Sequence, residues 1–394
     1  MHNNILIAGA GIGGLSAALG LARKGMRSIV LEKAPELGEI GAGIQLAPNA
    51  YHALDALGIG EVARQTGVHV DKLLWMDGMT DKEIASVPLA NRFREFFGNP
   101  YAVIHRADFH GLLVEACHKT GLVEVRTNAE VVDYENFPDR VEAILHDGSC
   151  INGAVLVGAD GLWSNVRQKV IGDGDPRVSG HTTYRSVIPA EDMPEELRWN
   201  MSTAWAGEGC HMVHYPLKGG KVFNLVLTSN SGASEPEAGV PVTTDEVFEK
   251  FKTMKRRPTS LIHKGNNWKR WVLCDRDPLP NWVDGRVTLL GDAAHPMMQY
   301  MAQGASMAIE DAVCLAFELG REMDPVSALK KYNRARFART ARVQTYSRYA
   351  SDFIYHAKGG AAAMRNELMG GMTPTDFFQW INWLYGKETV EKYK

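Results

Sequence analysis

The sequence predicts a mixed α/β (α+β) fold, in which a β-sheet domain is inserted into a Rossmann-like βαβ domain and a helical region follows. The chain opens with a strand-like run, a glycine-rich turn and a helix-like run. Alternating strand-like segments dominate residues 181–268, and the pattern from Pro325 onward is mostly helical. A chain of 394 residues is long enough for two domains and a full hydrophobic core.

The first element predicts a dinucleotide site. Gly9 permits a tight turn after the first strand, and Gly11 lets the backbone approach a pyrophosphate. Gly14 lets the helix of residues 15–24 pack closely on that strand, and the helix N-terminus adds donors and positive potential. Glu32 ends the next strand, where a carboxylate accepts hydrogen bonds from an adenosine ribose.

The segments that follow provide further backbone and charge for a flat ligand. Residues 40–50 form a glycine-rich loop that runs into a helix starting near Asn49. Arg106 precedes another helix-like stretch and is well placed for a phosphate or a ring edge. Three strand-like runs between residues 123 and 145 predict a meander, which ends in a buried strand over 154–157.

The last third of the chain returns to the parallel-strand pattern. The run 286–290 leads directly into Gly291 and Asp292, and a helix is expected over 305–322. His295 lies inside this second glycine-acid motif, and we expect it to have a structural role. Four arginines of the helical tail are most simply a solvated or interface face: Arg334, Arg336, Arg339 and Arg342.

Composition narrows the class of partner. The formal net charge is −3 and charged residues make up 23%, so nothing points to nucleic-acid binding, and small-molecule partners are expected. The five cysteines are scattered without CxxC spacing, which predicts neither a disulfide framework nor a metal site. The sequence has no uninterrupted run of about 20 apolar residues, the length of a membrane span. We therefore expect a cytoplasmic protein.

Three motifs in order resemble those of the single-component FAD-dependent aromatic hydroxylases. They are the glycine turn at Gly9, the pair Asp160-Gly161 with Arg167 downstream, and Gly291-Asp292 with Gln303-Gly304. The similarity runs from residue 4 to about residue 320. It implies the fold of p-hydroxybenzoate hydroxylase, a bound FAD, and a nicotinamide dinucleotide that binds transiently, since a second GxGxxG motif is absent from the sequence.

The resemblance also implies a set of cofactor residues and domain boundaries. Asp292 would contact the ribityl chain of FAD and Glu32 the adenosine ribose. The full set is Gly9, Gly11, Gly14, Glu32, Lys33, Gln45, Arg106, Asp160, Asp292, Gln303, Gly304 and Ala305. The predicted boundaries are 1–75, 100–180 and 269–325 for the FAD-binding domain, 76–99 and 181–268 for the β-rich substrate domain, and 326–394 for the helical region.

The inserted domain offers a base for phenol chemistry. A strand over residues 210–216 would place His211, Val213 and Tyr215 on one face, and Met212 and His214 on the other. Histidine titrates near neutral pH, and a tyrosine hydroxyl can donate or accept a hydrogen bond. The alternative interpretation is two half-buried strand residues that their neighbours satisfy.

Within the family, this segment and the loop after Asp292 resemble the 3-hydroxybenzoate 6-hydroxylases. That resemblance implies His211 as the base on the phenol, with Tyr215 and Gln299 as positioning partners. NADH and O2 would be used to convert 3-hydroxybenzoate to gentisate through a flavin C4a-hydroperoxide. Many relatives have proline where Met298 or Met301 lies here, which leaves the flavin-facing backbone open.

Other functions stay open at this point. A salicylate-type decarboxylating hydroxylase and a hydroxynicotinate monooxygenase differ in substrate pose, which the sequence does not specify. A flavin dehydrogenase or oxidase would form peroxide without inserting oxygen, and a flavin-binding redox sensor would catalyse nothing. A homodimer is the expected assembly.

Overall fold

A six-stranded sheet forms the core of the FAD-type half of the protein. The computed structural model describes residues 4–38 and 43–393. The strands lie in the order β19-β20-β12-β1-β2-β8, and all neighbours are parallel except β19 and β20. Their bounds are β1 Ile5–Ala8, β2 Ser28–Leu31, β8 Val123–Arg126, β12 Val155–Gly158, β19 Val283–Asp284 and β20 Val287–Leu289. The predicted opening of strand, glycine turn, helix and strand is confirmed.

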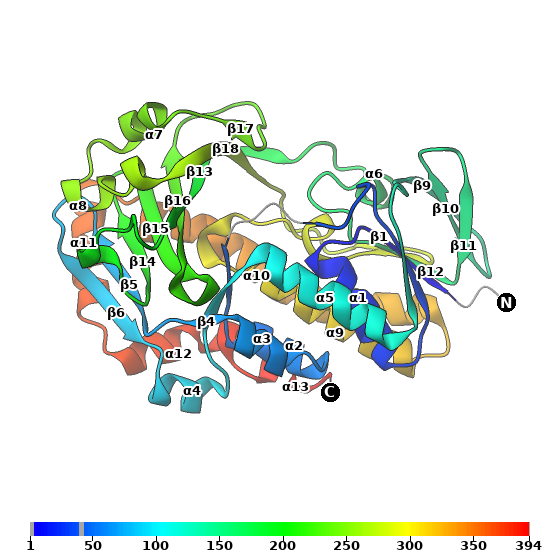
Figure 1. Cartoon of the computed structure of the whole chain (residues 1–394). Coiled ribbons are helices and arrows are strands. Elements are labelled where there is room, and N and C mark those ends of the chain that lie inside the picture. The colour runs from blue at the N-terminus through cyan, green and yellow to red at the C-terminus, as the bar shows by residue number, and fades with distance from the viewer. Residues whose placement is uncertain (1–3, 39–42, 394) are drawn as a thin grey trace.

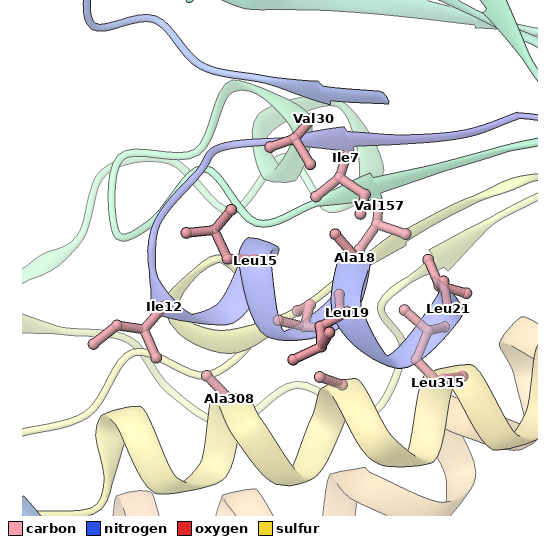
Figure 2. Packing of buried hydrophobic residues seen from close by; sticks show 14 of the residues in the cluster. Ile7, Ile12, Leu15, Ala18, Leu19, Leu21, Val30, Val157, Ala308 and Leu315 are labelled. Carbon is pink, nitrogen blue, oxygen red and sulfur yellow. The ribbon is translucent and has the colours of Figure 1, made fainter. Parts of the chain in front are cut away.

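Helix α1 (Ile12–Arg23) lies between this sheet and helix α9 (Gly304–Arg321). Figure 2 shows Ala18 directed toward the sheet near Val157, while Leu19 faces the α9 side. A Cβ on Gly20 would lie 3.1 Å from the Cβ of Ala316, so small residues set the close approach of the two helices. The apolar spacing predicted for the second helix therefore packs as a buried face.

Smaller sheets and helices surround this core. One antiparallel sheet consists of β9 Val131–Asn136, β10 Val141–Leu145 and β11 Cys150–Gly153, in agreement with the predicted meander. Another joins β3 Gly43–Leu46, β4 Val68–His69 and β7 Ala102–His105. The helices here are α2 Pro48–Ala56, α3 Gly60–Thr66, α4 Asn91–Phe97, α5 Arg106–Thr120 and α6 Asn165–Val170. Residues 40–42 of the predicted glycine-rich loop lie outside the described residues.

An eight-stranded sheet forms the other half of the molecule (Figure 1). Its order is β17-β18-β13-β16-β15-β14-β5-β6. The bounds are β5 Lys72–Asp77, β6 Glu83–Pro88, β13 Arg177–Pro189, β14 Met201–Ala206, β15 Cys210–Leu217, β16 Val222–Asn230, β17 Val240–Pro241 and β18 Asn266–Asp275. Helices α7 Thr244–Phe251 and α8 Arg256–Thr259 cover one end. The predicted α/β fold with a β-rich insertion is confirmed, and we retain the exact domain boundaries as a proposal.

Helices complete the chain: α10 Pro325–Ala350, α11 Gly359–Gly370, α12 Pro374–Tyr385 and α13 Glu388–Glu391. A π-helical turn, Ser351–Tyr355, ends α10, and α11 and α12 pack against β6. Thr373 and Asp376 form a capping box that fixes the start of α12. Within the residues described, none of the helices is long and apolar enough for a membrane crossing.

One interpretation of the tail is wrong in part. Arg334 and Arg342 are exposed as expected, but Arg336 is buried and Arg339 is half-buried. Arg336 pairs with Glu310 at 2.8 Å and with Asp311 at 2.6 Å, and Arg339 pairs with Glu310 at 2.6 Å. Sequence spacing on α10 could not reveal this, because both acidic partners lie on α9.

Candidate cofactor and substrate site

A cavity of about 790 Å³ lies where the two large sheets and the C-terminal helices meet. Most of the predicted site residues line it, although they come from segments almost 300 residues apart. They are Gly11, Gln45, Arg106, His211, Tyr215, Asp292, Gln299, Gln303, Gly304 and Ala305. Gly9, Gly14, Glu32, Lys33 and Asp160 are not part of the lining and lie beside it in the chain or in space. The arrangement brings one face of the inserted sheet to the edge of the βαβ unit.

The glycine turn has the space that a pyrophosphate requires. Gly9 has φ +100°, and a Cβ there would lie 2.5 Å from the carbonyl oxygen of Ala159. A Cβ on Gly14 would lie 2.0 Å from the carbonyl oxygen of Gly9, so the helix could not start as close to the strand. Gly11, by contrast, has open space where its Cβ would stand. The N-terminus of α1 has no side-chain cap, which leaves its N–H groups for an anion.

Glu32 is held beside this turn. Its carboxylate accepts hydrogen bonds from the backbone N–H groups of Ala10, at 2.7 Å, and Ala34, at 2.9 Å. Lys33 follows it and is exposed. A carboxylate with fixed orientation at a strand end, next to a phosphate-type turn, suits a ribose hydroxyl pair.

The second glycine-acid motif approaches the cavity from the other side. Gly291 has φ +61°, and the Asp292 carboxylate is accessible at the cavity wall. The surrounding protein raises the pKa of Asp292 by desolvation, while His295 and Arg106 act against that rise. Helix α9 begins at Gly304 without a side-chain cap, so its N-terminus also presents N–H groups beside the cavity. FAD, an elongated anion with two polar ends, fits donors of this kind.

His295 belongs to the supports of that motif. Its Nε2 bonds to the buried carboxylate of Asp311, which also accepts a hydrogen bond from the Gly291 N–H at 3.2 Å. Burial would raise the pKa of Asp311, but its interactions with His295 and Arg336 outweigh burial and lower that pKa to about 2. This environment agrees with the structural role expected for His295.

The segment that begins at Asp160 supports the loop that carries Asp292. Its carboxylate accepts hydrogen bonds from the Ser164 hydroxyl at 2.5 Å and the Val166 N–H at 3.2 Å. The buried Arg167 on the same short helix donates to the carbonyl oxygens of Ala293 and Ala294, both at 2.8 Å. The Asp160-Gly161 segment is thereby held against the loop that carries Asp292.

Strand β15 forms the substrate side of the cavity. His211, Val213 and Tyr215 all line it, and Met212 packs in the core on the opposite face of the sheet, so the predicted alternation is confirmed. Nδ1 of His211 lies 2.8 Å from Nε2 of His356. Burial, together with His356 and His181, lowers the pKa of His211 well below its usual value. The imidazole is thus neutral at working pH and able to accept a proton.

Two buried tyrosines and one glutamine lie together on the wall of this pocket. The Tyr101 hydroxyl donates to Oε1 of Gln45, and Tyr215 shares a side-chain hydrogen bond with the same glutamine. Burial raises the pKa of Tyr215, so the phenol is protonated and available as a donor. Tyr101 is a lining residue that the sequence reasoning missed, because no motif includes it.

Arg185 on β13 was also missed, and it alters the role of Gln299. Its guanidinium donates to Oε1 of Gln299 at 3.1 Å, while Nε2 of Gln299 donates to the hydroxyls of Thr183 and Thr228, both at 2.8 Å. Among the described residues, no carboxylate lies within ion-pair distance of Arg185. Burial lowers its pKa, yet a guanidinium stays charged in a protein. Strand β13 also carries serine, histidine and threonine residues, so no sequence signal sets Arg185 apart.

No cluster of three metal-ligating side chains occurs in the described part of the chain, and all five cysteines are free. The cavity carries polar groups that suit an organic cofactor and an organic ligand. Its two halves differ in character: backbone donors and Asp292 on one side, and His211, Tyr215 and Arg185 on the other.

Comparison with known proteins agrees with this division. A model of the FAD binding domain matches residues 2–347. The chain is 46% identical over 382 residues to the 3-hydroxybenzoate 6-hydroxylase of Klebsiella oxytoca, covering 97% of this chain and 96% of the relative. It is also 46% identical over 383 residues to the 3-hydroxybenzoate 6-hydroxylase of Polaromonas naphthalenivorans, covering 97% and 95%.

A solved structure, Klebsiella pneumoniae HpxO complexed with FAD and uric acid, has the same fold, with a TM-score of 0.85 and 24% identity over 98% of this chain and 97% of that one. The match to the FAD binding domain spans most of the chain, and the two hydroxylases cover it almost completely. The chain therefore belongs to the family of FAD-binding proteins that its three motifs predict.

Proposed function

We propose that this protein is an FAD-dependent monooxygenase that uses NADH and O2 to hydroxylate 3-hydroxybenzoate para to its hydroxyl, giving 2,5-dihydroxybenzoate (gentisate). The relatives named above support the substrate, since two of them at 46% identity are 3-hydroxybenzoate 6-hydroxylases. The three cofactor motifs support FAD, and the β15 face supports a phenolic acid.

The observation that carries the proposal is a cation and a neutral base on one face of the inserted sheet. Arg185 pairs with Val226 on β16, and Val226 pairs with Val213 on β15, so these three residues lie in one row. Two strand spacings amount to about 10 Å between the outer backbones. His211 and Tyr215 flank Val213 on the same face. A benzoate with a phenol suits this pair, with its carboxylate toward Arg185 and its hydroxyl toward His211.

The chain's own residues would bind, orient and deprotonate the ring. FAD, when bound, supplies the activation of O2 by electrons from NADH. Arg185 and the Tyr215 hydroxyl bind the carboxylate, and Gln299 orients Arg185 because its amide already makes three hydrogen bonds. Nε2 of His211 accepts the phenol proton, which makes the ring electron-rich at the para carbon. Asp292 and the N-termini of α1 and α9 hold the cofactor.

Several finer features belong to the same proposal. NADH is favoured over NADPH because Glu32 serves FAD and the sequence shows no separate arginine-rich site for a 2′-phosphate. We propose a cytoplasmic enzyme, supported by five free cysteines. We also propose a homodimer, supported by Tyr349 and Trp380 on the C-terminal helices, which are 73% and 49% exposed. Light scattering on the purified holoenzyme tests the assembly, and a monomer at micromolar concentration would contradict it.

The direct test is turnover by the purified flavoprotein. NADH oxidation is measured with 3-hydroxybenzoate, salicylate, 4-hydroxybenzoate and 6-hydroxynicotinate, and the products are identified after reaction in ¹⁸O2. We expect gentisate with one labelled oxygen. Carbon dioxide release from salicylate at a higher kcat/KM would favour a decarboxylating hydroxylase. Peroxide without labelled product from any acid would indicate a flavin protein that inserts no oxygen.

A further inference from the structure

His211 belongs to a cluster of buried rings whose other members the proposed chemistry does not yet use. We define the histidine cluster as His181, His211, His356, Tyr300 and Tyr355. Nδ1 of His211 lies 2.8 Å from Nε2 of His356, and Nδ1 of His181 lies 2.6 Å from the Tyr300 hydroxyl. The ring centroids of His181 and His356 are 5.1 Å apart. Of the three histidines, His211 lines the cavity and the other two stand behind it.

His211 alone is a poor final acceptor for a phenol proton. Its side chain is buried, and the same surroundings that keep it neutral oppose an imidazolium ion. Once Nε2 has taken the proton, the ring carries a charge in a site that destabilises charge. A second proton must therefore leave the ring from Nδ1, and His356 is the group in hydrogen-bond contact with that nitrogen.

We propose that His356 is a positioning residue that relays the phenolic proton from His211 toward solvent. The proposal rests on the proposed function. The phenol O–H bond breaks as an N–H bond forms at Nε2 of His211. The Nδ1 proton of His211 moves to Nε2 of His356, and the Nδ1 proton of His356 moves to water, which carries the positive charge away. Both imidazoles end neutral with exchanged tautomers, and the phenolate accepts a hydrogen bond from His211.

The surroundings of His356 suit this transfer. The residue is 6% exposed and follows the π-helical turn, where its N–H donates to the Ser351 carbonyl oxygen at 2.9 Å and its carbonyl oxygen accepts from the Gly209 N–H at 3.2 Å. These bonds fix the ring against His211. Nδ1 of His356 is buried and has no hydrogen-bond partner among the described residues, so no protein acceptor competes for the proton that this nitrogen carries.

The charges around the cluster keep the relay neutral. Burial, then His181, then Lys358 lower the pKa of His356 to about 3. The carboxylate of Asp352 raises the pKa of His181 and that of Tyr300. Arg177 lowers the pKa of His181, and Asp275 raises it. The pKa values of both members of the His211–His356 pair are lowered, so both rings are neutral at neutral pH. The rate of proton transfer should therefore follow the external base and not the titration of either histidine.

The test measures ionisation of the bound substrate without turnover. The FAD-loaded enzyme is mixed with 3-hydroxybenzoate in the absence of NADH, and phenolate absorbance and proton release to an indicator dye are followed by stopped flow. In His356→Gln, the amide oxygen can still accept a hydrogen bond from the Nδ1–H of His211, but the amide cannot pass a proton. We expect unchanged flavin content and substrate affinity, and phenolate formation slowed by about 10-fold or more. Added imidazole or higher pH should recover part of the rate.

A wild-type rate in His356→Gln would show that His356 only holds the ring of His211, and it would overturn the relay. His214→Gln is the matched control, because it removes a buried histidine from the same strand on the opposite face. It should form phenolate at the wild-type rate. A wild-type enzyme that neither ionises nor hydroxylates 3-hydroxybenzoate would contradict the proposed function itself, and a failure confined to the variant prediction would contradict the relay alone.

A measurement on the wild type covers the case in which His356→Gln does not fold. Phenolate formation is recorded in mixtures of H2O and D2O. Transfer of several protons along the His211–His356 pair should give a curved dependence of the rate on the deuterium fraction. A linear dependence would mean that a single proton moves, and the relay would be wrong.

Discussion

Arg185 is a single cation whose removal should separate binding of the acid from binding of the ring. In Arg185→Met, loss of a charge-assisted hydrogen bond of about 1.5–3 kcal/mol should raise the KM for 3-hydroxybenzoate about 10- to 100-fold. The KM of the uncharged 3-hydroxybenzyl alcohol should change little. Steady-state kinetics with both compounds checks this. Equal effects on acid and alcohol would remove the carboxylate from the side of Arg185.

His211 should affect chemistry more than binding. His211→Ala should keep FAD and lower the hydroxylation rate by about 100-fold or more, the usual size of a general-base contribution. Raising the pH should recover part of the loss, because hydroxide can then ionise the phenol. The pH profile of single-turnover product formation tests this. A wild-type rate at neutral pH would leave Tyr215 as the next residue to replace.

For single residues, the sequence predicts which face of a strand a side chain occupies better than it predicts which distant side chains that residue contacts. The period of two placed His211 and Tyr215 on one side of β15, because side chains alternate in any extended strand. The contact of His211 with His356 joins residues 145 positions apart, and no local pattern encodes it. Arg185 was missed for the same reason, since its environment is created by Gln299 on another segment.

Helices α9 and α10 depend on one another through a buried network of charges. Arg336 stands between Glu310 and Asp311, both fully buried. Arg336→Met should lower the free energy of unfolding by about 3–5 kcal/mol, because two carboxylates lose a buried partner. The exposed Arg334 on the same helix gives the control variant Arg334→Met, which should change little. Urea unfolding of the holoenzyme decides the matter, and equal stability of the two variants would contradict the network.

Two buried histidines, one on strand β15 and one after the turn behind it, should make the free energy of unfolding depend on pH. The pKa values of His214 and His356 are both lowered from 6.5 to about 3 by burial. Below about pH 6.5 the unfolded chain binds protons that the folded chain does not, so stability falls as the pH falls toward 3. Each such histidine contributes a slope of up to about 1.4 kcal/mol per pH unit.

Replacing one of these histidines should remove its contribution to the dependence of the free energy of unfolding on pH. Urea unfolding between pH 6.5 and 4.5, above most carboxylate titrations, is measured for the wild type and for His214→Gln. The variant should lose less stability over this interval than the wild type does. Parallel curves would mean that His214 is protonated in the folded state.

At the scale of the whole molecule, bound FAD should stabilise the two halves of the protein together. A ligand at about 1,000 times its Kd adds about 4 kcal/mol to stability, so removal of FAD should lower the Tm. Asp292→Ala should lose flavin on dialysis and show a smaller difference between its FAD-loaded and FAD-free Tm values. Asp292→Asn keeps a polar group and should retain more flavin. Full flavin occupancy of Asp292→Ala after extensive dialysis would contradict a cofactor contact.

The global arrangement was predictable where order along the chain suffices. The three motifs around Gly9, Asp160 and Asp292 predicted the βαβ unit and its return after the insertion. The pairing of strands from distant segments was not predictable in this way. For example, β5 pairs in parallel with β14, which lies about 130 residues further along the chain. The burial of Arg336 likewise depends on the packing of α10 on α9, which amphipathic spacing alone does not identify.

The order of strands in the six-stranded sheet has a consequence for synthesis on the ribosome. Strand β1 is made first, but its neighbour β12 begins at Val155, and the face of α1 that packs on α9 stays uncovered until α9 is complete at Arg321. A nascent chain therefore exposes the apolar face of α1 until most of the polypeptide has left the exit tunnel. Such non-local closure is slow, and chaperones that bind apolar helices would have time to act. The loop that carries Asp292 can join the glycine turn only near the end of translation.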